Sequence, residues 1–540
     1  MRLNKTLMQW GAAGLLAATT AQAALVPVTT DIAANTTVTW YATNEYRLDT
    51  IIYVQTNATL IIEPGTVIYG AVNPTISRTD IPELVSALWV TRGGKLYATG
   101  TVDKPIIFTA EGDDLNGNIP PTQTSLWGGV VLMGNAVLNS AKDTVGNVSN
   151  PKFDVYEGVD GPGPNNEHRF GGNDDADSSG ALRYVSIRHA GRIFAPDSEL
   201  NVLTMAGLGS GTVLEYIEVY AGSDDGFEWW GGTAGSKYLV SAFCEDDDFD
   251  TDQGYRGTNQ FWLGIKAPWM VATADSRGIE SDGDLSQSTL GELPVNRWYA
   301  YNATIIGRGK DVTASDRGVA WNTRDEDAAN VFNSVFVAWH QGLKLDADGL
   351  YWHTNATPLA SIQNNLWDVN AGASSDEGQF IFTTAAFNNT VGDALLGPIS
   401  YNPDGVLDPR PQAGSPVFQD VLAGAPMPVS YRGAFSGPSD DWADGWTAVS
   451  QYGYLKPAVV SSTPNPVTLT ITLNGANVEI SFTSQAGFSY TLESTGTLSP
   501  AGWGTATGVS PANPQTGTGG TLTFTVPAAD AAKFFQVSAQ

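Results

Sequence analysis

The chain has 540 residues, and its 27 Lys and Arg stand against 56 Asp and Glu, which gives a net charge of −29. This balance argues against a nucleic-acid binder, because such a protein needs a basic surface to displace counterions from phosphates. Charged residues make up only 15% of the chain while Gly occurs 59 times and Pro 29 times, so the composition excludes a coiled coil or a charged disordered chain and indicates a large, turn-rich, all-β protein.

Residues 1–23 have the pattern of a secretory signal peptide. Arg2 and Lys5 precede a short apolar stretch, and Ala21-Gln22-Ala23 forms an A-x-A cleavage site. We therefore expect a secreted protein, extracellular or at the cell surface, with cleavage near Ala23. No later stretch reaches the ~18–20 apolar residues that a transmembrane helix requires, so we do not expect the protein to span a membrane.

Short runs rich in β-branched residues recur through the next 300 residues and are separated by Gly, Asn, Asp and Pro. Because strands this short with such uneven loops suit coils that stack on one another, they predict a solenoid from about Thr36 to Tyr454. The runs are Thr50–Val54, Ala58–Ile62, Thr66–Gly70, Leu88–Val90, Pro105–Thr109, Trp127–Leu132, Leu182–Ile187, Leu214–Val219, Tyr238–Val240, Asn302–Ile306 and Asn333–Val337. The side chains expected to face inward are Ile61, Val67, Tyr184, Ile217 and Ile305.

Several of these segments resemble a known architecture. The turn Glu63–Ile68, the Trp127-Gly-Gly run and the rungs that begin at Asn302 and Asn333 look like the right-handed parallel β-helix of pectate-lyase-like proteins. Further segments resemble an uncharacterised family of exported bacterial β-helix proteins that end in a β-sandwich module; these are Asp224–Gly232, Cys244–Gly254, Asp408-Pro-Arg-Pro and Gly414-Ser-Pro416. The resemblance implies a fold and export, and it does not imply a chemistry.

The predicted domains follow from these patterns. Residues 24–456 form the parallel β-helix, and the Pro/Ser/Thr-rich residues 457–466 form a linker. Residues 467–540 contain short alternating segments typical of a small antiparallel β-sandwich. Attachment or spacing is one role for this module, and a stabilising cap is the alternative.

The segment from Asp224 to Asp252 is the strongest candidate for a site. Its nine carboxylates face one base, Lys237, so they are either solvated or neutralised by a divalent cation, and hard oxygen donors select Ca²⁺. In a strand, alternate positions share a face, so the predicted metal ligands are Asp246, Asp248, Asp250 and Asp252. The alternative is a solvated acidic loop that keeps the protein soluble. Asp175-x-Asp177-x-Ser179 is a second, less complete candidate for a calcium loop.

Aromatic residues beside these carboxylates suggest a polysaccharide or another cell-surface component as partner. Trp229 and Trp230 are adjacent, so in a strand one of them must point outward, where an exposed ring can stack on a sugar. The alternative is that most of the 16 tryptophans fill the solenoid core or cover the ends of its coils. The residues predicted to bind the partner are Asp224, Asp225, Glu228, Trp229, Trp230 and Arg256.

The sequence leaves the catalytic residues, and whether the protein is an enzyme, undetermined. Polysaccharide lysis by β-elimination needs a basic residue near the acidic run, and the candidates are Lys237, Arg256, Lys266, Arg277 and Arg297. Hydrolysis by paired carboxylates is also open. The four histidines lack metal-ligand spacing, and Cys244 is expected to be a buried, inert thiol. The leading hypothesis is a calcium-supported glycan or surface interaction, and the alternative is a polysaccharide lyase or glycoside hydrolase on the same scaffold.

Overall fold

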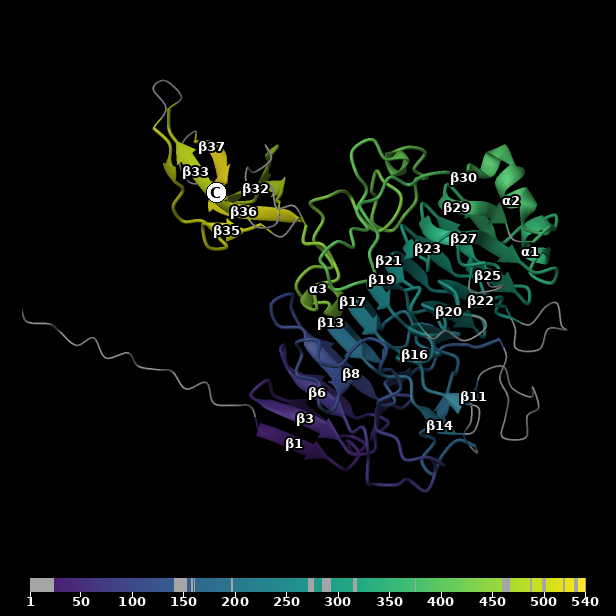
Figure 1. Cartoon of the computed structure of the whole chain (residues 1–540). Helices are drawn as coiled ribbons and strands as arrows, with labels where there is room; N and C mark the ends of the chain where they lie inside the picture. Colours follow the sequence, from purple (N-terminus) through teal and green to yellow (C-terminus); the bar gives the residue numbers. More distant parts are fainter. Residues whose placement is uncertain are drawn as a thin grey trace, which may run out of the picture. The chain divides into compact units, whose positions relative to one another are not determined.

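The computed structural model divides the chain into two compact units (Figure 1). The first extends to Gly437 and includes Asp441–Pro457, and the second comprises Pro438–Asp440 and Ala458–Gln540. The structure describes residues 24–139, 153–156, 159, 161–195, 198–270, 276–283, 293–313, 318–373, 375–458, 467–485, 488–497, 502–517, 520–528 and 533–539. The predicted signal peptide and most of the predicted linker therefore lie outside the described residues. Within the described ranges, no helix has the length and apolar character needed to cross a membrane.

The first unit is a parallel β-solenoid, as predicted, and its strands form three parallel stacks. The β4 stack is formed by β4 (Ile51–Val54), β7 (Ala87–Val90), β10 (Val130–Met133), β16 (Leu203–Ala206), β18 (Phe227–Trp230), β20 (Phe249–Asp252), β22 (Ile279–Asp282) and β25 (Val319–Arg324). The β2 stack contains β2 (Thr37–Trp40), β5 (Thr59–Ile62), β8 (Lys95–Thr99), β23 (Tyr299–Tyr301), β26 (Asn330–Phe332) and β28 (Ser361–Gln363). The β1 stack contains β1 (Ala24–Val28), β3 (Asn44–Leu48), β6 (Val67–Gly70), β9 (Ile106–Ala110), β24 (Thr304–Ile306) and β30 (Thr390–Val391).

Longer strands turn the corner between two stacks and so tie the faces together. They are β13 (Gly180–Arg188), β17 (Val213–Tyr220), β19 (Ser236–Ala242), β21 (Thr258–Ile265), β27 (Val335–Leu345) and β29 (Leu366–Ala373). Short helical segments follow the later coils: α1 (Tyr351–Thr354), α2 (Gln379–Thr383), η2 (Ala385–Phe387), η3 (Pro416–Phe418) and α3 (Ala448–Gln451).

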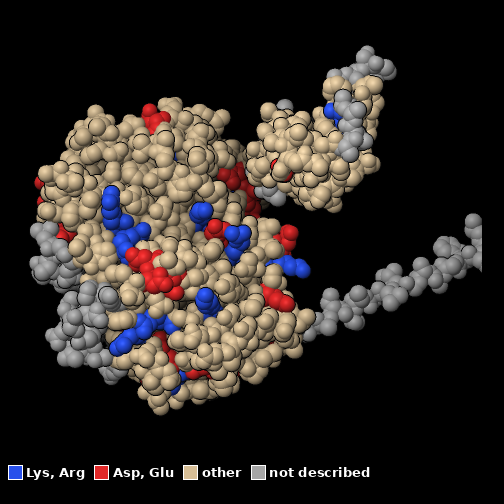
Figure 2. Space-filling model, turned by 180° about the vertical axis from the view of Figure 1, so that it is seen from behind, with Lys and Arg blue, Asp and Glu red and all other residues tan. Residues whose placement is uncertain are grey.

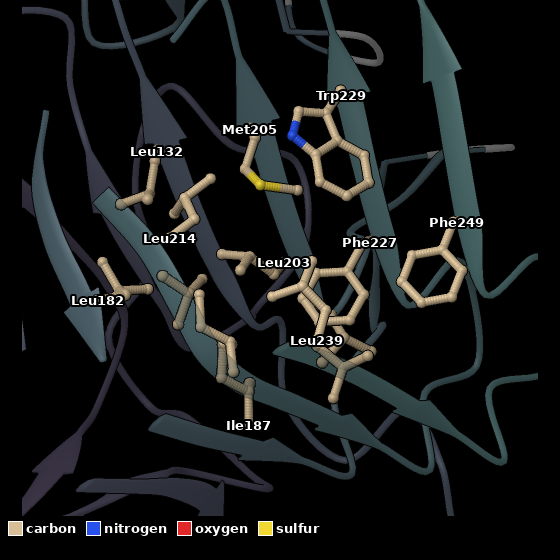
Figure 3. Packing of buried hydrophobic residues seen from close by; sticks show 14 of the residues in the cluster. Leu132, Leu182, Ile187, Leu203, Met205, Leu214, Phe227, Trp229, Leu239 and Phe249 are labelled. Atoms are coloured by element: carbon tan, nitrogen blue, oxygen red, sulfur yellow. The ribbon is translucent and has the colours of Figure 1, made fainter. Parts of the chain in front are cut away.

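The interior is filled by alternate side chains from all three stacks, which point toward one another in Figure 3. Aromatic rings stack within this core: the centroids are 5.5 Å apart for Phe227 and Phe249 of neighbouring coils, and 4.3 Å apart for Phe249 and Trp262 of consecutive strands. Such stacked pairs add to the free energy gained by burying apolar area. The core is therefore one continuous column.

The predicted inward residues are only partly correct. Ile217 and Ile305 are fully buried, as expected. Ile61 is 37% exposed and points outward, because the neighbouring Leu60 and Ile62 occupy the inward positions of β5. Val67 and Tyr184 are only half-buried. In a short run in which neighbouring residues are all apolar, odd and even positions look alike, so the pattern does not show which residues face the core.

One corner of the solenoid carries a column of residues in the left-handed conformation. It lies between the β2 and β1 stacks, and each member has a φ between 50° and 62°: Tyr184, Tyr216, Tyr238, Phe261, Asn302, Asn333 and Asn364. Asn adopts this region more readily than most residues, whereas for aromatic residues it is strained. Ring stacking accompanies the strain, with centroids 4.5 Å apart for Tyr184–Tyr216 and 4.4 Å apart for Tyr216–Tyr238.

After the last coil the chain runs back along this corner as a return segment (392–437 and 441–457). As the return segment proceeds, it contacts progressively earlier coils of the solenoid. Asn364 Nδ2 donates to Asp420 O, and Asn333 Nδ2 of the preceding coil donates to Leu422 O. Farther along, Asn302 Nδ2 donates to Tyr431 O, Trp446 packs on Tyr184, and Tyr452 Oη accepts a hydrogen bond from Arg188. The return segment thus closes this corner along most of the solenoid.

Insertions cover the outer face of the early part of the β4 stack. They contain β11 (Asp154–Val155), β12 (Arg169–Phe170), β14 (Ile193–Ala195) and β15 (Ser198–Glu199). Tyr156 of the insertion contacts the outward rings of Trp89 and Trp230, with centroids 4.7 Å and 4.6 Å away. The aromatic row on these strands is therefore buried under a second layer.

The second unit is a small antiparallel sandwich, as predicted. One sheet contains β31 (Thr470–Asn474), β32 (Asn477–Thr483) and β36 (Thr521–Pro527). The other contains β33 (Ser489–Thr495), β34 (Gly504–Thr505), β35 (Gln515–Thr516) and β37 (Phe534–Ala539). Ile480, Tyr490, Leu492 and Phe524 are fully buried between the two sheets.

We predict that Asn333→Ala destabilises the first unit by about 2–3 kcal/mol, because it removes two hydrogen bonds to Leu422 and leaves Ala in a left-handed conformation. Asn57→Ala is the matched control, since Asn57 has a φ of 63° but makes no contact with the return segment. It should cost only about 1 kcal/mol. Thermal unfolding of both variants measures the difference, and equal losses would show that docking of the return segment contributes little.

Candidate functional site

The outer face of the β4 stack changes from aromatic to acidic where the insertions end. Trp230 of β18 is in register with Asp252 of β20. The row beside it runs Glu228, Asp250 and Glu280 across β18, β20 and β22, because parallel pairing places these three side chains one above the other. Figure 2 shows a dense patch of acidic side chains bordered by basic ones.

A second set of carboxylates lies in the turns just before these strands. Asp225 is 8% exposed and Asp247 is 2% exposed. Asp225 Oδ1 accepts a hydrogen bond of 2.8 Å from the backbone N–H of Asp247, and Asp247 Oδ1 accepts one of 2.5 Å from the N–H of Arg277. Each coil therefore orients its carboxylate with a donor from the next coil.

These turns and strands bring five carboxylates into two overlapping groups. Asp224, Asp225 and Asp246 each offer an oxygen within 4.8 Å of the others, and so do Asp225, Glu228 and Asp250. Asp225 belongs to both groups. Carboxylate oxygens at this spacing are the donors that hard divalent cations such as Ca²⁺ use, so these five residues could hold one.

Proximity perturbs the protonation of these groups. The pKa values of Asp225, Asp247 and Asp250 are all raised well above the usual carboxyl range, first because burial penalises the charged form and second because neighbouring carboxylates repel it. The neighbours that act on Asp250 are led by Glu228 and Glu280. The site therefore favours a bound proton or a bound cation over bare charge.

Arginines border the acidic row on its later coils. Arg277 Nη1 donates to Glu280 Oε1 at 2.6 Å. Arg324 makes a bidentate pair with Asp282 at 2.6 and 2.7 Å, and its Nη1 lies 3.5 Å from Glu280. The positive charge thus lies toward Glu280 and Asp282, and within the described ranges no Lys or Arg nitrogen is recorded within 4 Å of Asp225 or Asp250.

A buried lysine stabilises the turn of acidic residues that precedes β20. Lys266 is fully buried, and its Nζ donates to the carbonyl oxygens of Cys244 and Asp246 and lies 3.6 Å from Asp248 Oδ1. Burial raises the pKa of Asp248 to about 6, although Lys266 opposes the shift. Burial also raises the pKa of the Cys244 thiol to about 11, which agrees with the expectation of an inert cysteine.

The structure separates the four aspartates that the sequence predicts as metal ligands. Asp246 lies in the first group and Asp250 in the second. Asp248 instead accepts a 2.6 Å hydrogen bond from Ser241 Oγ and faces Lys266, while Asp252 accepts one from the backbone N–H of Gln253. The alternation argument fails at Asp246 and Asp248 because they lie in the turn before β20, outside the strand.

The other predicted binding residues have mixed positions. Trp229 points into the core and Trp230 points outward, but the insertion covers Trp230 so that it is only 5% exposed. The expected exposed ring is therefore wrong for this pair. Arg256 makes a bidentate pair with Asp175 at 2.7 and 3.0 Å, which ties both residues to the framework. Asp177 accepts from the backbone and the side chain of Asn135, so the second candidate calcium loop is committed to internal contacts.

The sequence analysis missed three residues of the site, namely Glu280, Asp282 and Arg324. A signal for the two acids was present, because the segments Phe249-Asp-Thr-Asp252 and Ile279-Glu-Ser-Asp282 share an apolar–acid–polar–acid pattern. Aligning them as equivalent rungs would have placed Glu280 beside Asp250. Arg324 carries no such signal, because its role depends on the register of β25 with β22.

Comparison with known proteins agrees with this architecture. No curated protein matches the chain. A family model described as a pectate-lyase-like β-helix domain matches residues 32–395, which is more than half of the sequence and includes every strand of the acidic row. The chain therefore belongs to the pectate-lyase-like β-helix family.

Proposed function

We propose that this protein is exported and uses the acidic face of its β4 stack to bind Ca²⁺ and, through it, a polysaccharide or another cell-surface component. The observation that carries the proposal is the pair of carboxylate groups that share Asp225. Calcium accepts further oxygen ligands beyond those of the protein, so hydroxyl or carboxylate groups of a glycan can complete its coordination. The signal-peptide pattern of residues 1–23 supports action outside the cytoplasm.

The charge distribution favours a cation as the first ligand. With a net charge of −29, the chain repels a polyanion at long range, and an uncovered acidic row repels it locally. A bound divalent cation reverses the local sign, and the partly exposed Arg324 extends the positive border. A glycan bound there would lie across β18, β20 and β22 on the solenoid surface.

A specific observation also favours an enzyme as the second candidate. Asp225, Glu228 and Asp250 lie within carboxylate–carboxylate contact distance, and the pKa values of Asp225 and Asp250 are raised. A protonated carboxyl beside an ionised one is the pairing that glycoside hydrolysis requires. Lys266 is fully buried and Lys237 lies 3.8 Å from Glu215 on the outer side of another stack, so neither supports β-elimination at this row.

Calcium should raise the melting temperature of the protein, and chelation should reverse the effect, because an ion that binds only the folded state stabilises it by about 2.7 kcal/mol at a hundredfold excess over Kd. Asp225→Asn keeps the acceptor for the N–H of Asp247 but removes the shared charge. This variant should melt higher than the wild type without calcium and should lose the calcium-dependent shift.

The matched control is Asp177→Asn, which also replaces a hydrogen-bonded aspartate but lies outside both carboxylate groups. It should retain the full calcium shift. Loss of the shift in Asp177→Asn, or its persistence in Asp225→Asn, would rule out the shared site.

Without divalent cations, stability should fall as the pH rises from 6.5 to 8. Burial raises the pKa of Asp327 to about 7 in the folded state, so this group loses its proton across the window, whereas the unfolded carboxyls are already ionised. The pKa values of Asp225, Asp247 and Asp250 are also raised, which acts in the same direction. Each such group contributes up to about 1.4 kcal/mol per pH unit. Melting curves in chelator test this, and saturating calcium should flatten the slope. A slope of the opposite sign would contradict the assigned protonation.

Binding and catalysis can be separated on one panel of acidic and neutral polysaccharides. A binding protein should be retarded in affinity electrophoresis in the presence of calcium and release neither unsaturated nor reducing ends. Asp225→Asn should lose retardation, and Asp177→Asn should keep it. Product release that disappears in Glu228→Gln would instead identify the hydrolase.

A further inference from the structure

The small C-terminal sandwich has an unprotected edge. Strand β31 (Thr470–Asn474) lies at the border of the β31-β32-β36 sheet, and among the described residues it pairs only with β32. Its outer row of N–H and C=O groups is therefore available to another strand. Natural proteins usually protect such an edge with charged residues, Pro or a bulge, and Thr470-Ile-Thr-Leu-Asn474 has none of these.

The core-facing side of β31 is also uncovered. Ile471 is the cross-strand partner of Ile480, and Leu473 is the partner of Val478, so both point toward the same side of the sheet as the buried core. Ile480 is fully buried, yet Ile471 is 54% exposed and Leu473 is 70% exposed.

The alternating apolar pattern that includes Ile471 and Leu473 begins in the covered part of the sandwich. Val467 and Leu469 lie at alternate positions before Ile471 and pack against the core. The alternating apolar pattern then continues to Ile471 and Leu473, which the opposite sheet does not cover. A single copy gains nothing from apolar side chains there, so the pattern points to a state in which they are buried.

Charge favours a second copy of this chain as the occupant of that edge. The only Asp, Glu, Lys or Arg residues in 458–540 are Glu479, Glu493, Asp530 and Lys533, whereas the net charge of the whole chain is −29. None of these four lies in β31. Two copies that meet through this strand therefore bring together the least charged part of a strongly acidic protein.

We propose that β31 pairs antiparallel with β31 of a second copy about a two-fold axis at Thr472. In this register Ile471 of each copy lies opposite Leu473 of the other, and Thr472 lies opposite itself. The four apolar side chains form one cluster on the core side, and the two three-stranded sheets join into one continuous sheet. The interface is isologous, so it closes at two copies and leaves no free edge of β31.

The contact is small, and this determines the expected strength. A five-residue strand pair lies below the size of standard protein interfaces, so the dimer should dissociate on dilution. The proposal concerns the second unit alone and does not depend on the function proposed for the carboxylate groups around Asp225.

Site-directed cross-linking of the full chain tests the register. Cys244 is the only cysteine and is fully buried, so a cysteine introduced at Thr472 reports on this edge alone. Thr472→Cys should form a covalent dimer under mild oxidation or with a short bismaleimide, because directly opposite residues have Cβ atoms ~4.5–5.5 Å apart. Thr483→Cys is the control, since Thr483 is also exposed but lies on the central strand β32.

Sedimentation velocity across a concentration series provides the second measurement. The wild type should shift from monomer toward dimer as concentration rises, and the double variant Ile471→Lys/Leu473→Lys should remain monomeric, because it places like charges across the axis. Both side chains are exposed in one copy, so the variant should keep the wild-type melting temperature. A wild type that stays monomeric throughout, or equal cross-linking at positions 472 and 483, would overturn the proposal. In that case β31 would be an edge for a strand of a different protein.

Discussion

The whole structure depends on the in-register parallel pairing of successive coils. Backbone hydrogen bonds place equivalent positions of neighbouring coils about 4.8 Å apart, so a residue type that recurs in the repeat becomes a column in space. Phe227 and Phe249 stack inside the solenoid, and Glu228, Asp250 and Glu280 form an acidic row outside. The same rule that packs the core therefore also concentrates charge, and the chain must compensate for that repulsion.

Basic side chains of the fold balance one part of this repulsion between carboxylates, and a bound proton or cation can balance the other part. Arg277, Arg324 and Lys266 are permanent partners within the fold, and they serve Glu280, Asp282 and Asp248. Asp225 and Asp250 instead have raised pKa values, because burial and neighbouring carboxylates disfavour their charged forms. A buried charge without an adequate partner is costly, so a site that a protein leaves in this condition is suited to accept a proton or a metal ion. This physical contrast between the two halves of the acidic face is the reason for proposing the half around Asp225 as the binding site.

The sequence predicted the architecture better than the site, for a reason that the residues make plain. Periodicity and turn residues are local, so the solenoid and the terminal sandwich could be derived from runs such as Asn333–Val337. The site depends on register between coils, which is not local, and Glu280 was missed although its segment repeats the pattern of β20. Trp230 points outward, as adjacency required, but the cover formed by the insertion around Tyr156 comes from far along the chain. The sequence could not show whether Ile61 points inward or outward, since the odd and the even positions of its run are both apolar.

The return segment changes how the solenoid comes apart. In an array whose coils touch only their neighbours, stability is a sum of adjacent interfaces, and the terminal coils can fray one at a time. Here a single stretch of chain bonds to Asn364 in a late coil and to Arg188 in an early one. Opening the last coils therefore loosens the stretch that also holds the earlier ones. The consequence is that the coils from Arg188 to Asn364 are coupled in unfolding, which opposes partial unravelling with its exposed strand edges.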